Sequence, residues 1–276
     1  MSGTAAVNVR ELAAWGLDSY AFRPPTAMPC GEDRVWQRPA YLQTSALIEA
    51  ESRAHEAALR PHAARADLLL EMNGLDWSLG IVDLRHLLSF QRRLSFDSKA
   101  PGQPLPAAQD WPALINFSFG PPRPITCTSH LDETRALVLQ SEDPNLQLRF
   151  SIGGAQPITL YGGSPFLEVA EFRGRWFLRD GYHRAYRLLT YGIPAVPAVV
   201  IRARSLRELG AVQPWFFPEE ILFSDRPPQV VDFLDDLLTL QYTRPPLLKT
   251  LRLTVEESFA PAISKENTHE HCNQTR

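Results

Sequence analysis

The chain has 276 residues, of which 44% are hydrophobic and 21% charged, the composition of an ordinary soluble globular protein. Its formal net charge of -3 argues against nucleic acid as the main partner, because such proteins need a basic footprint. No apolar run approaches the length of a membrane span, and the first residues do not have the pattern of a secretory signal.

The cysteines indicate neither a disulfide framework nor a metal site. Cys30, Cys127 and Cys272 lie far apart, with no CxxC spacing between them. A zinc shell needs four ligands that this pattern does not supply, so no metal site is predicted. A reducing, cytoplasmic location is therefore expected.

Proline and polar residues divide the chain into four expected parts. Residues 1–44 are predicted to be flexible or to lie on the surface, because prolines interrupt them. Residues 45–125 are expected to be helical or mixed and to end in a proline-rich linker. Residues 126–260 are predicted to form the main domain with a C-terminal extension, and residues 261–276 a disordered tail.

Apolar spacing predicts most of the regular elements. Helices are predicted over 45–59, capped by Ser45 and ended by Pro61, over 83–94, over 205–210 and over 230–240. Strands are predicted over 77–82, 157–161 and 251–255, with hairpins over 135–140/146–152 and 166–172/175–178. The prolines between 98 and 124 predict a linker or a long loop there.

The most informative stretch runs from Arg175 to Ile201. A short apolar strand ends at Leu178, and the spacing of residues 182–191 is helical. Gly192 is placed to end that helix, and 198–201 is a second apolar strand. The unit predicted here is strand, tight turn, helix, strand.

The turn of this unit carries residues suited to an anion. A helix start exposes unpaired N–H groups, and Gly181 permits a close approach to the backbone. Arg187 follows His183 by four residues and Arg184 by three, so all three lie on the first helical turns. Asp180 is placed to cap the helix. These features predict a phosphate site, although arginines on a helix flank often form only a solvated face.

The sequence Asp180-Gly181-Tyr182-His183-Arg184, followed by a short helix, a glycine and a Val-Pro strand, resembles the ParB/sulfiredoxin-like superfamily. The resemblance implies that this turn holds nucleotide phosphates, such as those of ATP or CTP with magnesium. Gly181, His183 and Arg184 would then contact phosphate together with the adjoining Tyr182, and Arg187 would be a further candidate.

The chain also departs from this family. Where sulfiredoxins have a catalytic cysteine, it has Tyr182, which cannot replace a thiolate, so sulfiredoxin chemistry is not expected. DNA-partitioning ParB proteins have two successive arginines at the turn and a helix-turn-helix afterwards. Here His183 precedes Arg184, and no helix-turn-helix follows. DNA is therefore not expected to be the main partner.

Together these observations predict an α+β fold with a small mixed sheet and a ParB/sulfiredoxin-like core. The first hypothesis is a nucleotide- or phosphate-binding domain with phosphotransfer or NTP hydrolysis, for which Asp180 is the candidate catalytic carboxylate. The second is a catalytically inactive relative that serves as a protein-interaction or regulatory module. A third, nuclease activity, lacks the acidic cluster that would hold metal ions.

Overall fold

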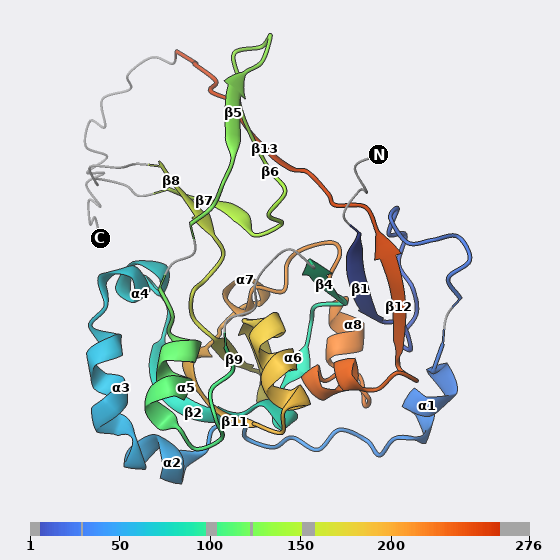
Figure 1. Ribbon diagram of the computed structural model, residues 1–276, viewed down its shortest axis with the longest axis vertical. Coiled ribbons are helices and arrows are strands. Elements are labelled where there is room, and N and C mark those ends of the chain that lie inside the picture. The colour runs from blue at the N-terminus through green and yellow to red at the C-terminus, as the bar shows by residue number, and fades with distance from the viewer. Residues whose placement is uncertain (1–5, 29, 98–103, 122–123, 151–157, 260–276) are drawn as a thin grey trace, which may run out of the picture.

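Figure 1 shows a computed structural model of the chain, which describes residues 6–28, 30–97, 104–121, 124–150 and 158–259. The fold is mixed α+β, with several small sheets and mostly short helices. The predicted tail, 261–276, lies outside the described residues. Within them, no helix has the length and apolar character needed to cross a membrane.

A five-stranded mixed sheet forms the centre of the body, in the order β2-β11-β9-β10-β3. Its strands are β2 Trp77–Asp83, β3 Leu88–Ser89, β9 Glu168–Phe172, β10 Arg175–Asp180 and β11 Ala195–Arg202. β9 pairs antiparallel with β10 and parallel with β11, which in turn pairs antiparallel with β2. Because β2 and β11 come from opposite sides of the expected boundary at residue 125, one sheet joins both regions.

The unit predicted between Arg175 and Ile201 is present. The β9–β10 hairpin turns at Arg173 and Gly174, whose φ angles are 51° and 73°. Positive φ angles at both residues are required in a two-residue type I′ turn, which matches the twist of the two strands. Helix α6, Tyr182–Thr190, follows the second strand and ends before Gly192, whose φ is 70°. The predicted helix over 205–210 is α7, Leu206–Leu209, which is capped by the Ser205 hydroxyl.

Short helices cover the central sheet, with α2 and α3 packed on β2, and α5 on β11. The remaining helices and 3₁₀ turns are α1 Glu32–Gln37, α2 Glu49–Ala54, α3 Glu56–Ala63, α4 Ala66–Glu71, α5 Trp111–Ser118, α8 Glu219–Leu222, η1 Leu84–His86 and η2 Val230–Leu234. The helix predicted over 45–59 is thus two helices that meet at His55. Pro61 lies inside α3, where it has no N–H to donate to the Ala57 carbonyl, and the helix ends two residues later, at Ala63.

The helix predicted over 83–94 is wrong. The Asp83 side chain accepts the Arg85 N–H and caps only the 3₁₀ turn η1, after which the chain becomes extended in β3 and β4, Arg93–Asp97. The leucines of this stretch are fully buried, so their spacing reflects contacts with distant segments and not one helical face.

Two further expectations also fail in part. The proline-rich stretch 98–124 contains a helix, α5, because Asp110 caps it and Pro112 stands in its first turn, where proline is tolerated. The helix predicted over 230–240 is only the 3₁₀ turn η2, and the chain then enters strand β12, Thr239–Arg244.

The N-terminal segment differs from the expected surface-lying chain. Strand β1, Val7–Leu12, is largely buried as the middle strand of the sheet β12-β1-β4. The Glu11 carboxylate is fully buried between Arg23 and Arg93, at 2.5 Å and 2.9 Å, and it also accepts the Tyr242 hydroxyl at 2.8 Å. A buried charge with these partners holds the first residues in the fold.

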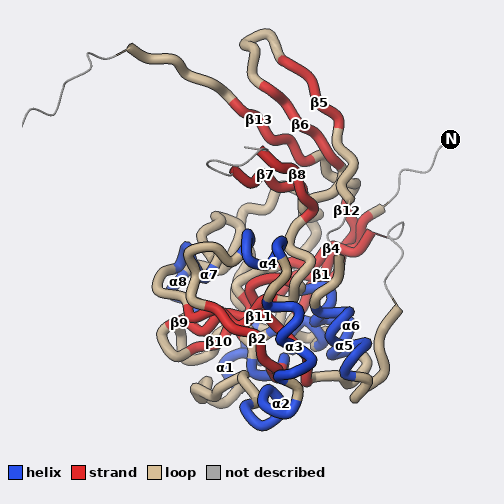
Figure 2. The backbone as a smooth tube through the Cα atoms, turned by 90° about the vertical axis from the view of Figure 1, so that its left-hand side faces the viewer, coloured by secondary structure: helices blue, strands red, loops and turns tan. Residues whose placement is uncertain are grey.

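Two smaller sheets project from one end of the body (Figures 1 and 2). One contains β5 Thr128–Leu131, β6 Leu137–Ser141 and β13 Lys249–Leu253 in the order β13-β6-β5, and the other pairs β7 Leu146–Phe150 with β8 Ile158–Gly162. The predicted hairpin over 135–140/146–152 is therefore wrong, because β6 and β7 pair in different sheets. The predicted strands over 157–161 and 251–255 correspond to β8 and β13.

Candidate functional site

The predicted turn lies between β10 and α6, where the sheet, α5 and α6 meet. Gly181 is the residue before α6 and adopts a left-handed conformation, with φ 90° and ψ 22°. A Cβ at this position would lie 3.3 Å from the Cα of Leu167 and 3.2 Å from Nη2 of Arg184. Glycine is needed here because the backbone is left-handed and because Leu167 and Arg184 fill the adjacent space.

The Arg184 guanidinium is directed at main-chain carbonyl groups. Its Nη1 donates to Pro165 at 2.5 Å and to Ser118 at 3.3 Å, and its Nη2 donates to Phe166 at 2.5 Å. A weaker contact of 3.5 Å reaches the carbonyl of Phe117. Arg184 therefore joins the start of α6 to the end of α5 and to the segment that enters β9.

His183 and Arg187 point elsewhere. The exposed His183 ring has its Nε2 2.9 Å from the Ser95 carbonyl oxygen and packs edge-on against Phe96, with ring centres 5.4 Å apart. Arg187 is half-buried one turn further on. His183 and Arg184 thus follow each other in sequence but bind carbonyl groups of different segments.

Tyr182 belongs to the core. Its side chain is 5% exposed, and its hydroxyl donates to the Leu178 carbonyl at 2.7 Å and accepts the Phe90 N–H at 3.3 Å. Burial raises the pKa of this phenol well above its usual range. Tyr182 is therefore a neutral, hydrogen-bonded core residue.

Asp180 does not cap α6, because the N-cap residue is Gly181 and the Asp180 carboxylate instead accepts the N–H of Gly181. It pairs across the β9–β10 hairpin with Glu168, which is 1% exposed. Burial and the negative charge of Glu168 raise the pKa of Asp180 to about 6. The register of the hairpin thus brings a second carboxylate, Glu168, to the turn.

Arg179 offsets part of this negative charge. Its guanidinium forms an ion pair with one Glu168 oxygen and donates from Nε to the Glu208 carbonyl at 3.1 Å. The other oxygen, Oε1, is buried and has no hydrogen-bond partner among the described residues. Two carboxylates thus face each other at the turn, and a proton on Asp180 relieves their repulsion.

These contacts limit the chemistry available at the turn. The guanidinium groups of Arg179 and Arg184 both bind protein oxygen atoms, and the acidic pair adds negative charge where a phosphate would enter. Two cavities formed by the described residues are lined by none of the six predicted site residues. Within the described part of the chain, no group of three or more His, Cys, Asp or Glu residues could hold a metal ion.

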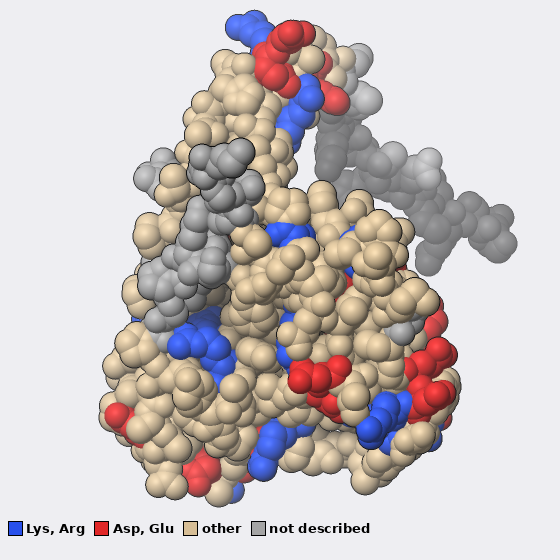
Figure 3. All heavy atoms as spheres, turned by 45° about the vertical axis from the view of Figure 1, so that its right-hand side comes forward, with Lys and Arg blue, Asp and Glu red and all other residues tan. Residues whose placement is uncertain are grey.

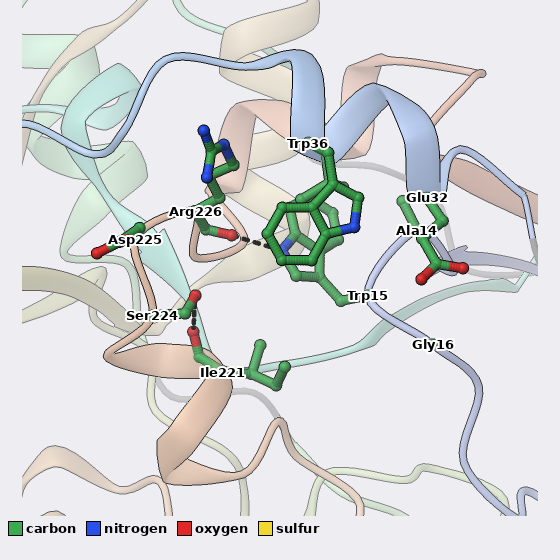
Figure 4. A pocket seen from close by; sticks show the side chains of 10 residues that line it. Ala14, Trp15, Gly16, Glu32, Trp36, Ile221, Ser224, Asp225 and Arg226 are labelled. Atoms are coloured by element: carbon green, nitrogen blue, oxygen red, sulfur yellow. Dashed lines mark hydrogen bonds between the residues drawn. The ribbon is translucent and has the colours of Figure 1, made fainter.

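One of these cavities was not anticipated from the sequence. It has a volume of about 540 Å³, and its walls include Trp15, Trp36 and Arg226 (Figure 4). No local signal links residues near 15, 36 and 226, because only the tertiary fold brings them together.

Comparisons with known proteins do not assign the chain to a family. No protein-family model, curated protein or solved structure matches it.

Proposed function

We propose that this chain is a non-catalytic binding module built on a ParB-like core. The observation that carries the proposal is the engagement of Arg184, whose guanidinium donates to the carbonyls of Ser118, Pro165 and Phe166. An arginine that binds a phosphate presents its planar fork to the ligand. Here the guanidinium instead binds main-chain carbonyl groups and stabilises the turn. The ParB-like residues of the turn are therefore interpreted as a structural element.

The projecting sheets support a role in binding a protein partner. β5 lies at the edge of its sheet, and all four of its residues are exposed, with Leu131 at 67%. An edge strand offers unpaired N–H and C=O groups, to which an extended segment of a partner adds as a further strand. On the face shown in Figure 3, acidic and basic side chains are interspersed and form no extended basic surface. This distribution favours a protein over DNA.

A second candidate function is binding of a nucleotide or another phosphate ligand at the turn. It is favoured by the N–H groups that open α6 after Gly181, together with the exposed His183 and the half-buried Arg187. Hydrolysis or phosphotransfer would need magnesium and a carboxylate base, a role that Asp180 would fill with its pKa of about 6.

Equilibrium dialysis separates the two functions. ATP, ADP, CTP and GTP are tested one at a time, with and without magnesium, and phosphate release is measured in parallel. The binding-module proposal predicts neither retention of a nucleotide nor release of phosphate. Saturable retention of one nucleotide that is lost in Arg187→Ala would overturn it in favour of the second function.

The protein-binding role has its own test. A photo-reactive residue at position 130, on β5, should cross-link a discrete partner in an extract of the source cells. The same residue at Tyr191, which is 71% exposed on the body, serves as the control. Identical cross-links from both positions would contradict a role for the edge strand.

A further inference from the structure

The cavity next to Trp36 has the size and the walls of a small-molecule site. Its volume of about 540 Å³ falls within the range of known ligand pockets, roughly 300–1,000 Å³. It lies between the residues that follow β1, helix α1 and the residues that follow α8 (Figure 4). Three separate segments, none of them part of the Gly181 turn, thus form one concave surface.

Two indole rings provide its aromatic walls. The Nε1 of Trp15 donates to the Arg226 carbonyl at 2.7 Å, so the polar atom of this ring is already bonded. Trp36 stands on α1 and is 66% exposed. A tryptophan that borders a cavity and leaves so much apolar surface in water is a typical feature of binding sites.

The arginines near the two rings are already engaged. Arg226 donates from Nε to the Arg38 carbonyl at 2.8 Å, and its guanidinium carbon lies 5.6 Å from the centre of the Trp36 ring. Arg38 pairs with Asp232 at 2.8 Å and lies 5.7 Å from the centre of the Trp15 ring. Both indoles therefore already interact with a cation in the folded protein.

The carboxylates that line the cavity are in a different situation. The side chains of Glu32 and Asp225 are exposed and have no hydrogen bond or ion pair with any other described residue. The unpaired Glu32 carboxylate at the wall of the cavity, together with the two indoles, favours a positively charged ligand, because π faces and carboxylates both attract cations.

We propose that this cavity binds a small organic cation with an apolar body, such as a quaternary or aromatic amine. The apolar body contacts Trp15, Trp36 and Ile221, and the cationic head lies near Glu32. The inference goes beyond the proposed function and does not depend on it, since it involves no residue of the Gly181 turn or of the projecting sheets.

Three probes with the same phenyl ring test the charge preference: benzyltrimethylammonium, benzyl alcohol and benzoate. Calorimetric titration of the full chain should give saturable binding of the cation, at least about tenfold tighter than that of the neutral or the anionic probe. The absence of saturable binding of the cation, or equal binding of the three probes, would overturn the proposal. Tighter binding of benzoate would also overturn it and would assign the site to Arg226.

Substitutions inside and outside the cavity test where the cation binds. Trp36→Ala should weaken binding of the cation about tenfold and Glu32→Gln about threefold, whereas Trp215→Ala and Glu133→Gln should leave it unchanged. Trp215 is 54% exposed and Glu133 is exposed, and neither lines the cavity. Thermal melting of each variant confirms that it is folded. Unchanged binding in folded Trp36→Ala would contradict the assignment.

Discussion

The Arg184 guanidinium donates from Nη2 to the carbonyl oxygen of Phe166 at 2.5 Å, and this bond fixes the first turn of α6 against the residues that enter β9. The neighbouring Nη1 extends the connection to Pro165 and to Ser118 at the end of α5. One side chain thus joins three segments that are far apart in sequence, which explains an arginine at this place without a ligand.

Replacing Arg184 by alanine should destabilise the protein by about 2–4 kcal/mol, because several carbonyl groups lose a charged donor. The free energy of unfolding from urea denaturation measures this change. Arg187→Ala is the matched control and should change it by less than about 0.5 kcal/mol, since no described residue hydrogen-bonds to the Arg187 side chain. Equal effects of the two variants would contradict the structural role of Arg184.

Gly181 should not tolerate alanine. Its φ of 90° is unfavourable for any residue with a Cβ, and that Cβ would lie 3.3 Å from the Cα of Leu167. Gly181→Ala should therefore cost about 2 kcal/mol or more in thermal or urea unfolding. Gly16 has a similar φ of 86° but no atom within 4 Å of an added Cβ, so Gly16→Ala measures the backbone cost alone. A Gly181→Ala loss no larger than that of Gly16→Ala would refute the close packing.

Asp180 should give stability a specific dependence on pH. Its pKa rises from 3.8 to about 6 in the folded protein, so the fold favours the protonated carboxyl. This contribution is fully present below about pH 4 and is lost as the pH rises through 6. Asp180→Asn, which keeps an acceptor for the Gly181 N–H but carries no charge, should match the wild type near pH 4. It should be more stable by about 1–3 kcal/mol above pH 7.

Urea unfolding of both proteins at several pH values between 4 and 8 provides the comparison. The difference between the two proteins isolates Asp180 from other groups that titrate in this range, such as His62, whose pKa is lowered by burial and by Arg65. A difference that stays constant with pH would show that the pKa of Asp180 is not raised in the fold.

The buried carboxylate of Glu11 should be important for stability. Glu11→Gln removes the buried negative charge that Arg23 and Arg93 share and leaves Asp18 to balance both guanidinium groups, so it should cost about 3 kcal/mol. Glu56→Gln removes an exposed carboxylate from the pair with Arg60 and should cost under about 1 kcal/mol. Calorimetric melting distinguishes the two variants, and similar melting temperatures would contradict the ranking.

The elements that were predicted correctly are those specified by residues close to each other in the sequence. The β9–β10 hairpin is specified by its Arg173-Gly174 turn, and α6 is specified by the apolar spacing of 182–191 and by Gly192. Strand β1 was missed because its stability comes from β4 and β12, which are distant in sequence. The prediction of a helix over 83–94 was wrong for a related reason. The leucines of this stretch are buried in the core by several short elements and not by one helix.

The candidate site was predicted as a set of positions but not as a geometry. The spacing of His183 and Arg184 places both at the start of α6, whereas the direction of each side chain depends on which carbonyl groups the tertiary fold brings near. Glu168 could not be placed at the turn from the sequence, because only the register of the hairpin puts it opposite Asp180. The Trp15–Trp36 cavity joins three segments and could not be predicted locally.

The most direct measurement is thermal melting of the wild type and of Arg184→Lys, each alone and with the magnesium complexes of ATP and CTP. Lysine keeps the charge that a phosphate would need but not the planar fork that bridges Pro165 and Phe166. We predict that Arg184→Lys melts several degrees lower without ligand, and that neither nucleotide shifts either protein. A variant that melts like the wild type, together with a nucleotide-dependent rise in melting temperature of the wild type, would contradict this account.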